Sequence, residues 1–418
     1  MHINKKLFFS FSIFLLSACT SLEKEEIQKN DTIITEPKTI ETYSAEKVDV
    51  YFEKDTTLSL YEPENGVYLG AYILSNKYVN FSIEAFEETT NKEHSMYMYH
   101  TKIGNPFPQD FVLGCIANLK APYIVLSAEN QSNPFDKSKM VETAKRFGEF
   151  YVPIFIEFYP NMRTRGYNPQ EYIEFYRYTH EVFREHATNV AFVFSVSDNE
   201  IPDFLEYYPG EEYVDWVSLN LSKKVNENGN LSYLENNVFD KIDYVYHVFQ
   251  EKKPIVISGL AISHFSTVNH VYHSDEAGRE IDRIYAIISE RYPRIKAINY
   301  MDYNSIDPVN RNFGKDNFSI TENQTILSYY HDTVKKEAFL QNIDFSSGGE
   351  EVRQLMKSAF YGYKIADDYY ISEYSIRHEL NYDENLTDFI EIDEKKYINI
   401  SVLGCNYDIM YDRIIFKK

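Results

Sequence analysis

Reactive side chain types stand at the end of an apolar run within residues 151–172. The run breaks at a proline, and the polar loop that follows begins with Asn161. Glu157 lies four residues before Asn161, so the alternation of side chains along a strand is expected to place both on one face. A carboxylate buried on the inner face of a strand needs a polar partner. We expect Arg163, Arg165 or a distant lysine to supply it.

Further carboxylates follow apolar runs elsewhere in the chain, namely Glu129, Asp198, Glu200 and Asp302. Carboxyl groups that meet at the ends of neighbouring strands can act as a general acid and a general base, so any two of these side chains, or one of them with Glu157, form a candidate pair. The alternative for Glu129 and Asp302 is a structural role, in which they hydrogen-bond neighbouring loops.

Eight short β-rich runs recur at regular intervals and would position these side chains. They cover residues 66–74, 95–103, 121–129, 151–159, 189–197, 214–222, 253–261 and 295–303. Several are nearly continuous in apolar residues, as is typical of parallel strands that are covered on both faces.

Segments with helical periodicity separate the runs. The clearest spans 168–187, with Asn168 as the N-cap and Pro169 at the first helical position. A second spans 274–293. Alternation of strand and helix repeated eight times predicts an α/β fold of the (β/α)8 TIM barrel type. A doubly wound α/β sheet is the alternative, but no glycine-rich phosphate loop follows any run.

The pattern changes after residue 334. Residues 335–418 show short alternating runs and turn residues, which predict a small, mostly β accessory domain at the C-terminus, preceded by one helix over 350–361. The barrel is then expected over 49–334. Residues 20–48 are rich in Lys, Glu and Thr and predict a disordered tether.

The first 19 residues have the features of an export signal. A short basic region precedes an apolar run that is too short for a permanent membrane helix. The run ends in Leu16, Ser17, Ala18 and Cys19. This ending resembles the bacterial lipoprotein signal, in which the cysteine is acylated, so we predict a lipid anchor at Cys19 and a location at the bacterial cell envelope. The alternative is an ordinary secretory signal.

The composition excludes some partners. The chain has 42 Lys and Arg against 64 Asp and Glu, a net charge of −22. Such a surface repels phosphate backbones, so we predict no nucleic-acid partner, and it disfavours anionic polysaccharides for the same reason. Tyrosines number 37, whereas Trp216 is the single tryptophan. Any aromatic platform for a sugar would therefore be a tyrosine.

The cysteine and histidine spacings indicate no cofactor and no metal. Cys115 and Cys405 lie in apolar surroundings that favour buried thiols, although a disulfide between them stays open in an exported protein. His264, His270 and His273 lie close together in a polar segment without a fixed period, which is a weak signal for metal ligands.

Several segments, taken in order, resemble glycoside hydrolase family 26. The most specific is 207–221, where Tyr-Pro-Gly-Glu-Glu-Tyr-Val-Asp-Trp leads into the sixth run. Residues 171–197 resemble the helix and fifth strand of the family. Weaker similarities lie at 81–88, 253–258 and 297–304, so the resemblance covers roughly residues 66–330.

The resemblance implies a retaining endo-glycosidase that acts on β-mannans or related glucans and xylans. Such enzymes need two carboxyl groups about 5 Å apart, one as acid/base and one as nucleophile. The acid/base position, at the end of the fourth strand, falls on Asn161, and the nucleophile position, at the end of the seventh, falls on Gly259. Neither residue can perform the implied step. Ser222 and Ala128 stand where the family has aromatic residues.

The resemblance also implies a ligand at the barrel mouth, with candidate contacts from Glu129, Tyr159, Asn161, Tyr300 and Asp302. Tyrosines at 167, 207, 208 and 303 also stand near predicted strand ends, although each one singly is more often a packing residue. Trp216 is expected to pack in the core.

Three hypotheses follow. The first is a lipoprotein whose glycosidase-like barrel no longer hydrolyses and is retained to bind a polysaccharide, such as β-mannan, or a surface protein. The second is an active endo-β-glycosidase that uses relocated carboxylates, with Glu157, Glu129 and Asp302 as the fallback set. The third is a structural envelope protein that uses the same fold.

Overall fold

The computed structural model describes residues 38–39, 45–128, 130, 132–224, 226–227, 230–231, 237–266, 270–307, 316–382, 386 and 389–418. The expected signal segment and Cys19 lie outside these residues, and so does Glu129. Within the described ranges, no helix is long and apolar enough to cross a membrane.

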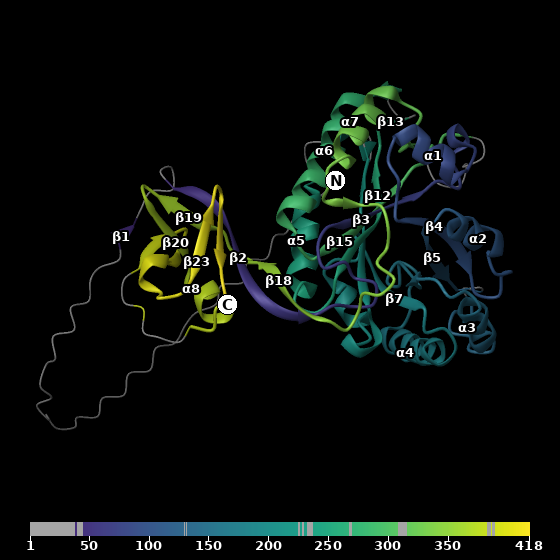
Figure 1. Ribbon diagram of the computed structural model, residues 1–418, viewed down its shortest axis with the longest axis horizontal. Helices are drawn as coiled ribbons and strands as arrows, with labels where there is room; N and C mark the ends of the chain where they lie inside the picture. The colour runs from purple at the N-terminus through teal and green to yellow at the C-terminus, as the bar shows by residue number, and fades with distance from the viewer. Residues whose placement is uncertain are drawn as a thin grey trace, which may run out of the picture.

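Eight parallel strands close into a barrel, as the sequence predicts (Figure 1). They are β3 (Val67–Tyr72), β4 (Met96–Lys102), β5 (Ala121–Ser127), β6 (Ile154–Phe158), β7 (Val190–Ser197), β8 (Trp216–Asn220), β12 (Ile255–Ile262) and β15 (Ile295–Met301). Strand β15 pairs with β3 over five residues and so completes the ring. An open, doubly wound sheet is therefore excluded.

Helices cover the outside of the barrel. They are α1 (Ile83–Thr90), α2 (Gln109–Ala117), α3 (Met140–Gly148), α4 (Pro169–His186), α5 (Val238–Phe249), α6 (Ser274–Arg291) and α7 (Gln324–Val334). The side chain of Asn168 accepts a hydrogen bond from the Glu171 N–H at 3.1 Å, so the predicted N-cap of α4 is confirmed. After β7, two short 3-10 turns, η3 (Asp203–Tyr207) and η4 (Glu211–Tyr213), take the place of a helix.

Side chains alternate between two apolar clusters, one between sheet and helices and one inside the barrel. The inner cluster contains Trp216, which is fully buried and donates from its indole N–H to the Leu60 carbonyl at 2.8 Å. Tyr61 also belongs to it, so the segment before β3 closes the end of the barrel at which the strands begin. The expected core position of Trp216 is confirmed.

A second sheet forms the smaller lobe at the left of Figure 1. Its members are β1 (Lys38–Thr39), β2 (Glu46–Thr57), β18 (Glu351–Lys357), β19 (Gly362–Ile365), β20 (Asp368–Ser372), β21 (Ile390–Ile392), β22 (Lys395–Asn399), β23 (Tyr407–Met410) and β24 (Arg413–Phe416), with the helix α8 (Glu373–His378) beside them. Strand β2 lies inside this sheet, between β19 and β24, so the lobe is built from both ends of the described chain.

The prediction of a helix over 350–361 is wrong, because residues 351–357 form the strand β18. All seven of its residues pair with β2 in antiparallel register. The long free edge of β2 supplies the main-chain partners, and such pairing outweighs local helix preference. Strand β2 also takes in residues 46–48, which the sequence suggested as tether, and residues 49–57, which it suggested as barrel.

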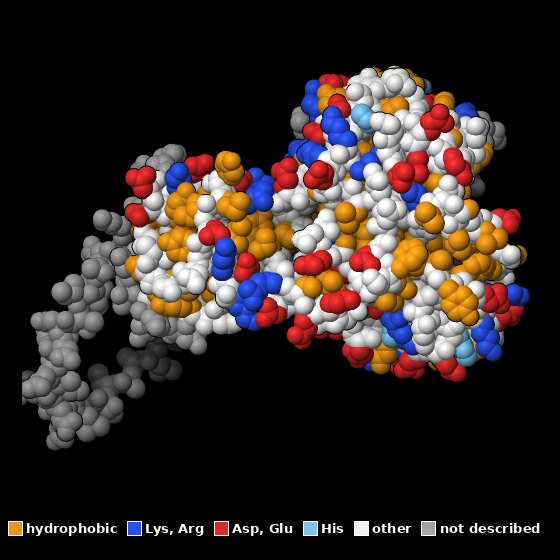
Figure 2. Space-filling model, viewed as in Figure 1, with side chains coloured by type: hydrophobic (Ala, Val, Ile, Leu, Met, Phe, Trp, Pro, Cys, Tyr) orange, Lys and Arg blue, Asp and Glu red, His pale blue; other side chains and the backbone are white. Residues whose placement is uncertain are grey.

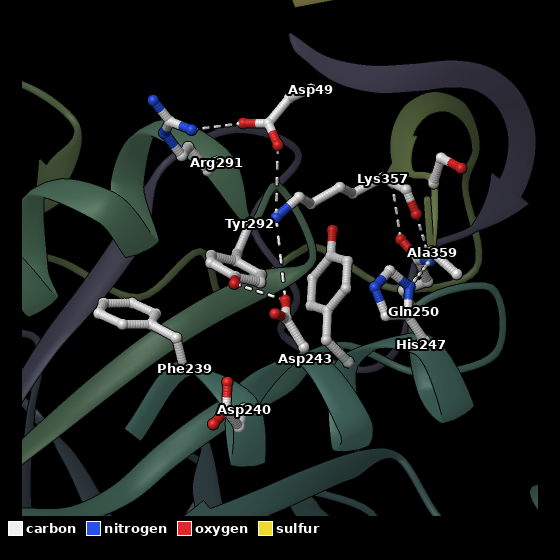
Figure 3. Close-up of polar contacts among 12 residues, drawn as sticks. Asp49, Phe239, Asp240, Asp243, His247, Gln250, Arg291, Tyr292, Lys357 and Ala359 are labelled. Atoms are coloured by element: carbon white, nitrogen blue, oxygen red, sulfur yellow. Dashed lines mark hydrogen bonds and ion pairs between the residues drawn. The ribbon is translucent and has the colours of Figure 1, made fainter. Parts of the chain in front are cut away.

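The two lobes meet through a buried polar network (Figure 3). The side chain of Gln250, at the end of α5, exchanges two hydrogen bonds of 2.8 Å with the backbone of Lys357. The Lys357 ammonium lies 3.7 Å from Asp49 and 3.8 Å from Asp243. Arg291, at the end of α6, pairs with Asp49 at 2.8 Å. Helix ends that precede β12 and β15 therefore hold the smaller lobe at the end of the barrel opposite its mouth.

Candidate functional site

Glu157 lies inside the barrel and is 2 % exposed. Its carboxylate accepts hydrogen bonds from the Tyr123 hydroxyl at 2.8 Å and from the Ser195 hydroxyl at 2.6 Å. Burial raises the pKa of Glu157, and these hydrogen bonds oppose the rise. The expected partners are wrong: Arg163 pairs with Asp203 instead. The other expected partner, the Arg165 guanidinium, donates to the Pro160 carbonyl. Tyr123 lies on β5 and Ser195 on β7, the two strands beside β6, so their hydroxyl groups reach the Glu157 carboxylate and satisfy its hydrogen bonds without an ion pair.

The mouth of the barrel contains a hollow of about 240 Å³ above the ends of β8, β12 and β15. Its lining residues are Asn220, Ser222, Lys224, Gly259, Ala261, Met301, Tyr303, Asp316 and Phe318. A small sheet of β13 (Phe265–Ser266), β14 (Val271–Tyr272) and β16 (Asp316–Asn317) stands over this end of the barrel, and β16 brings Asp316 to the hollow. Two further short elements lie nearby in the sequence, β9 (Ser222–Lys223), which pairs with β12, and the hairpin β10 (Asn226–Glu227) and β11 (Asn230–Leu231).

Asp316 is the one carboxylate among the described residues that line this hollow. Burial raises its pKa, and the charge of Lys224 opposes the rise. Its Oδ1 atom has no hydrogen-bond partner in the described protein. This oxygen is buried, so any contact of Asp316 with a ligand hydroxyl would come from the part of the carboxyl group that lines the hollow.

Three ring side chains extend the mouth from β15 towards β4. The Tyr72 ring lies edge-on to Tyr303 at 6.4 Å and edge-on to His100 at 5.2 Å. The His100 side chain is exposed, but the barrel atoms around it disfavour the charged imidazolium and lower its pKa to about 4. At neutral pH the imidazole is uncharged and offers one donor and one acceptor.

The chain leaves the extended conformation directly after β6. Tyr159 has a φ of 49° and Asn161 a φ of 61°, both in the left-handed region. This turn places the Tyr159 ring against Phe175 of α4, and its hydroxyl donates to the Pro134 carbonyl at 2.7 Å. The expected alternation from Glu157 to Asn161 is therefore wrong. Tyr159 is a packing residue, whereas Asn161 is half-buried at the rim.

Gly259 lies directly against Asn220 of the neighbouring strand. A Cβ atom built on Gly259 would lie 2.4 Å from the Asn220 Nδ2 atom and 2.9 Å from its Cγ atom. The register of β12 also shifts between Ile257 and Leu260. The amide of Asn220 thus occupies the space into which a side chain at position 259 would begin.

Asp302 and Tyr300 are both fully buried. The Asp302 carboxylate accepts hydrogen bonds from Asn76 Nδ2 at 2.6 Å, from the Thr321 hydroxyl at 2.9 Å and from the Ile320 N–H at 2.8 Å. This arrangement corresponds to the structural alternative for Asp302. Tyr300 lies three residues after Ala297, which faces into the barrel, so strand alternation turns the Tyr300 side chain towards the helices. Its ring lies 6.1 Å from that of Tyr330 on α7.

The carboxylates after β7 hold loops. Asp198 pairs with Lys241 at 2.9 Å. Glu200 is 1 % exposed and accepts hydrogen bonds from the backbone N–H groups of Arg163 and Thr164 at 3.0 and 3.1 Å. Glu200 therefore fixes the turn that follows Asn161.

The sequence profile of glycosyl hydrolase family 26 matches residues 119–306. The barrel is glycosyl hydrolase family 26-like. A modular endo-beta-1,4-mannanase from Cellulomonas fimi is 12% identical, with 82% of this chain and 94% of that chain covered and a TM-score of 0.50. An engineered protein is 14% identical, with 71% and 76% covered and a TM-score of 0.50. At these identities the likeness shows the fold alone. No curated protein matches the chain.

The residues by which the family 26-like barrel was recognised mostly have structural roles. Arg184 makes a two-pronged ion pair with Asp215, with distances of 2.7 and 2.5 Å. The side-chain amide of Asn189 donates to three carbonyl groups that precede β6. These contacts fix helix α4 and the following strands, which explains why the motif predicts the fold better than the site.

Sequence reasoning missed Asn220, Asp316, Tyr72 and His100. His100 lies within a predicted strand, directly after Tyr99, which packs outward against Phe111 of α2. Strand alternation therefore turns His100 towards the inside of the barrel, and this alternation was the signal that could have identified it. Asp316 had no such signal, since it belongs to a loop strand far from the barrel strands in sequence.

The cysteines and histidines singled out from the sequence form neither a disulfide nor a metal site among the described residues. Cys115 and Cys405 are both free thiols, so the disulfide left open by the sequence is absent from the described structure. His264 is buried, and its carbonyl accepts a hydrogen bond from the His273 N–H at 2.6 Å. No group of three or more His, Cys, Asp or Glu side chains among the described residues could hold a metal ion.

Proposed function

We propose that this protein binds a neutral polysaccharide in the mouth of its family 26-like barrel and does not hydrolyse it. The observation that carries the proposal is the contact between Gly259 and Asn220. The family nucleophile would stand at position 259, but the Asn220 amide lies within 2.4 Å of the first side-chain atom that any other residue would place there. The Asn220 amide therefore occupies the space in which the side chain of the family nucleophile would begin.

The opposite side of the mouth supports the same proposal. The acid/base position is Asn161, whose amide cannot transfer a proton at neutral pH. The fallback carboxylates Glu157 and Asp302 are fully engaged by hydrogen bonds inside the protein. A retaining hydrolase needs two carboxyl groups on either side of the scissile bond. Among the described residues, Asp316 is the only carboxylate that lines the hollow, and the third fallback carboxylate, Glu129, lies outside the described residues.

The side chains that remain are suited to bind a sugar. The half-buried Tyr303 supplies aromatic surface and is backed by the buried Phe318, with ring centroids 5.2 Å apart. Asn220 supplies an exposed amide, and Asp316 supplies a carboxyl group that lines the hollow. Apolar rings with a few convergent polar groups are typical of sites that bind small polar ligands and sugars. Since the fold is shared with mannanases, β-1,4-mannan is the first ligand to test.

Isothermal titration with β-1,4-mannohexaose, together with a reducing-sugar assay on the same mixture, tests the proposal. We expect binding without release of shorter sugars. Asn220→Ala should weaken binding, whereas Gln170→Ala, which removes an exposed amide on α4, should not. Turnover that Asp316→Asn abolishes would favour the alternative, an endo-β-glycosidase that uses Asp316 as a relocated carboxylate. No binding to mannohexaose would overturn the proposal for β-mannan.

We further propose that the chain is exported and anchored by a lipid at Cys19, on the strength of the Leu-Ser-Ala-Cys ending of the signal segment. Bacteria that express the full chain should incorporate radioactive palmitate into it. Cys19→Ala should abolish the label, whereas Cys115→Ala should leave it unchanged. Label that persists in Cys19→Ala would contradict the anchor.

A further inference from the structure

A second concave surface lies outside the mouth, between helices α2 and α3, which are neighbours on the side of the barrel (Figure 1). A hollow of about 540 Å³ is lined by the loop from β4 to α2, by the end of β5 and by α3. A second hollow, of about 390 Å³, shares Ile103 and Lys139 with the first and reaches Asn133 and Tyr159. The two hollows border each other at Ile103 and Lys139, and together they are called here the outer groove.

The outer groove has an aromatic floor and amide walls. The Phe107 ring is held against Phe150, with centroids 5.2 Å apart, and edge-on to Phe147 at 4.9 Å. Asn105 and Gln109, both exposed, stand on the wall formed by the β4–α2 loop and the start of α2. A fixed apolar surface with amides beside it can pack against the C–H groups of a sugar ring and bind its hydroxyl groups.

The charges that line the outer groove balance, unlike those of the whole chain. Among the described residues, its lining carries three cations and three acids, which are Lys102, Lys139, Arg146, Asp136, Glu142 and Glu149. The whole chain has a net charge of −22, and Figure 2 shows acidic side chains scattered over the visible face. A balanced groove on an acidic protein favours an uncharged ligand over an anionic or a cationic one.

We propose that the outer groove is a second binding site for a neutral, hydroxyl-rich oligosaccharide chain, and that it takes a part of the polymer beyond the part held in the mouth. This inference rests on the proposed function for the choice of ligand. Two hollows that border each other on the side of the barrel fit a linear chain better than a single sugar. The affinity for the polymer should therefore rise with its length.

Isothermal titration with β-1,4-mannotriose and β-1,4-mannohexaose tests the inference. The double variant Asn105→Ala/Gln109→Ala changes two exposed side chains of the groove wall, and Gln170→Ala is the matched control on α4. Each lost ligand hydrogen bond weakens binding about fivefold, so the double variant, which removes two, should bind mannohexaose about 25-fold more weakly than the wild type. Its affinity for mannotriose should be unchanged, and the control should equal the wild type for both sugars.

The outcomes separate the outer groove from the mouth. Wild-type affinity of the double variant for mannohexaose overturns the outer groove. If Asn220→Ala lowers the affinity for both sugars in that case, the mouth proposal stands without the outer groove. If Asn220→Ala changes the affinity for neither sugar while the double variant lowers the affinity for mannohexaose, the outer groove is supported and the mouth proposal fails. Failure of the wild type to bind either sugar overturns both.

Discussion

Because Gly259 and Asn220 are in contact, a substitution at Gly259 is expected to remove the ligand hydrogen bond that Asn220 makes. In Gly259→Ala the new Cβ atom would meet the Asn220 amide at 2.4 Å, well inside van der Waals contact. Asn220 is exposed, so its side chain can rotate away from the new atom. We therefore expect Gly259→Ala to displace the Asn220 amide from the mouth hollow while the barrel stays folded.

The magnitudes follow from what each change removes. Moving an exposed side chain into a less favourable rotamer costs about 0.5–1.5 kcal/mol, so Gly259→Ala should lower the free energy of unfolding by no more than about that amount. The loss of one ligand hydrogen bond from Asn220 is worth about 1 kcal/mol, or about fivefold in the dissociation constant for mannohexaose. Asn220→Ala should produce the same loss of affinity.

The assay is a double-mutant cycle measured by isothermal titration, with urea unfolding of each variant as the stability control. If Gly259→Ala acts by displacing the Asn220 amide, Gly259→Ala/Asn220→Ala should bind no more weakly than either single variant, because the same interaction is removed only once. Losses that add in the double variant would refute the reasoning, and so would wild-type affinity of Gly259→Ala. A large loss of stability in Gly259→Ala would show that Asn220 cannot move.

Four further predictions concern stability and restored chemistry. Glu157→Ala should destabilise the fold by about 3 kcal/mol in urea unfolding, since it leaves two buried hydroxyls without their acceptor, whereas Glu157→Gln should cost less than half as much; equal effects would contradict this account. Burial lowers the pKa of His94 to about 3, so its contribution to stability is complete above pH 6.5 and is lost as the pH falls towards 3, by about 2 kcal/mol at pH 5. His94→Asn should show a shallower fall of unfolding free energy between pH 6.5 and 5, and an unchanged slope would count against the assignment. Gly259→Glu with Asn161→Glu should gain hydrolysis of mannan, measured as reducing sugar, because the exposed Asn220 side chain can rotate away from position 259; activity that appears only after Asn220→Gly is added would show that Asn220 cannot move. At the junction between the lobes, Gln250→Ala leaves a buried N–H and a buried carbonyl of Lys357 without partners, which should cost about 2–3 kcal/mol in urea unfolding. The exposed control Gln170→Ala should stay within about 0.5 kcal/mol of the wild type, and equal stability of these two variants would argue against a fixed junction.

The sequence by itself determined the barrel. Parallel strands covered on both faces require nearly continuous apolar runs, and all eight runs became strands of the ring. The sequence also predicted the N-cap of α4, because Asn168 and the N–H group that it accepts from are three residues apart and need no distant group. Where the physical cause lies within a few residues, the sequence states it directly.

The tertiary structure decided what depends on residues far apart in the chain. Strand β18 is a strand and no helix because β2 offers it a free edge, and the paired residues Arg353 and Asp55 are 298 positions apart. The hydroxyls that satisfy Glu157 come from two neighbouring strands, and no spacing in the sequence announces them. The left-handed backbone at Tyr159 turned a predicted ligand contact into a packing residue.

The family resemblance named positions 161 and 259 as the places where carboxylates are missing, and the sequence showed that much. Only the folded barrel brings Asn220 against Gly259, because the two lie on different strands and meet through the lateral packing of β8 against β12. Side chains across a barrel mouth converge through strand pairing and tilt, which local sequence patterns do not encode. The identity of the missing groups was therefore readable from the chain, whereas what fills their space was fixed by tertiary packing.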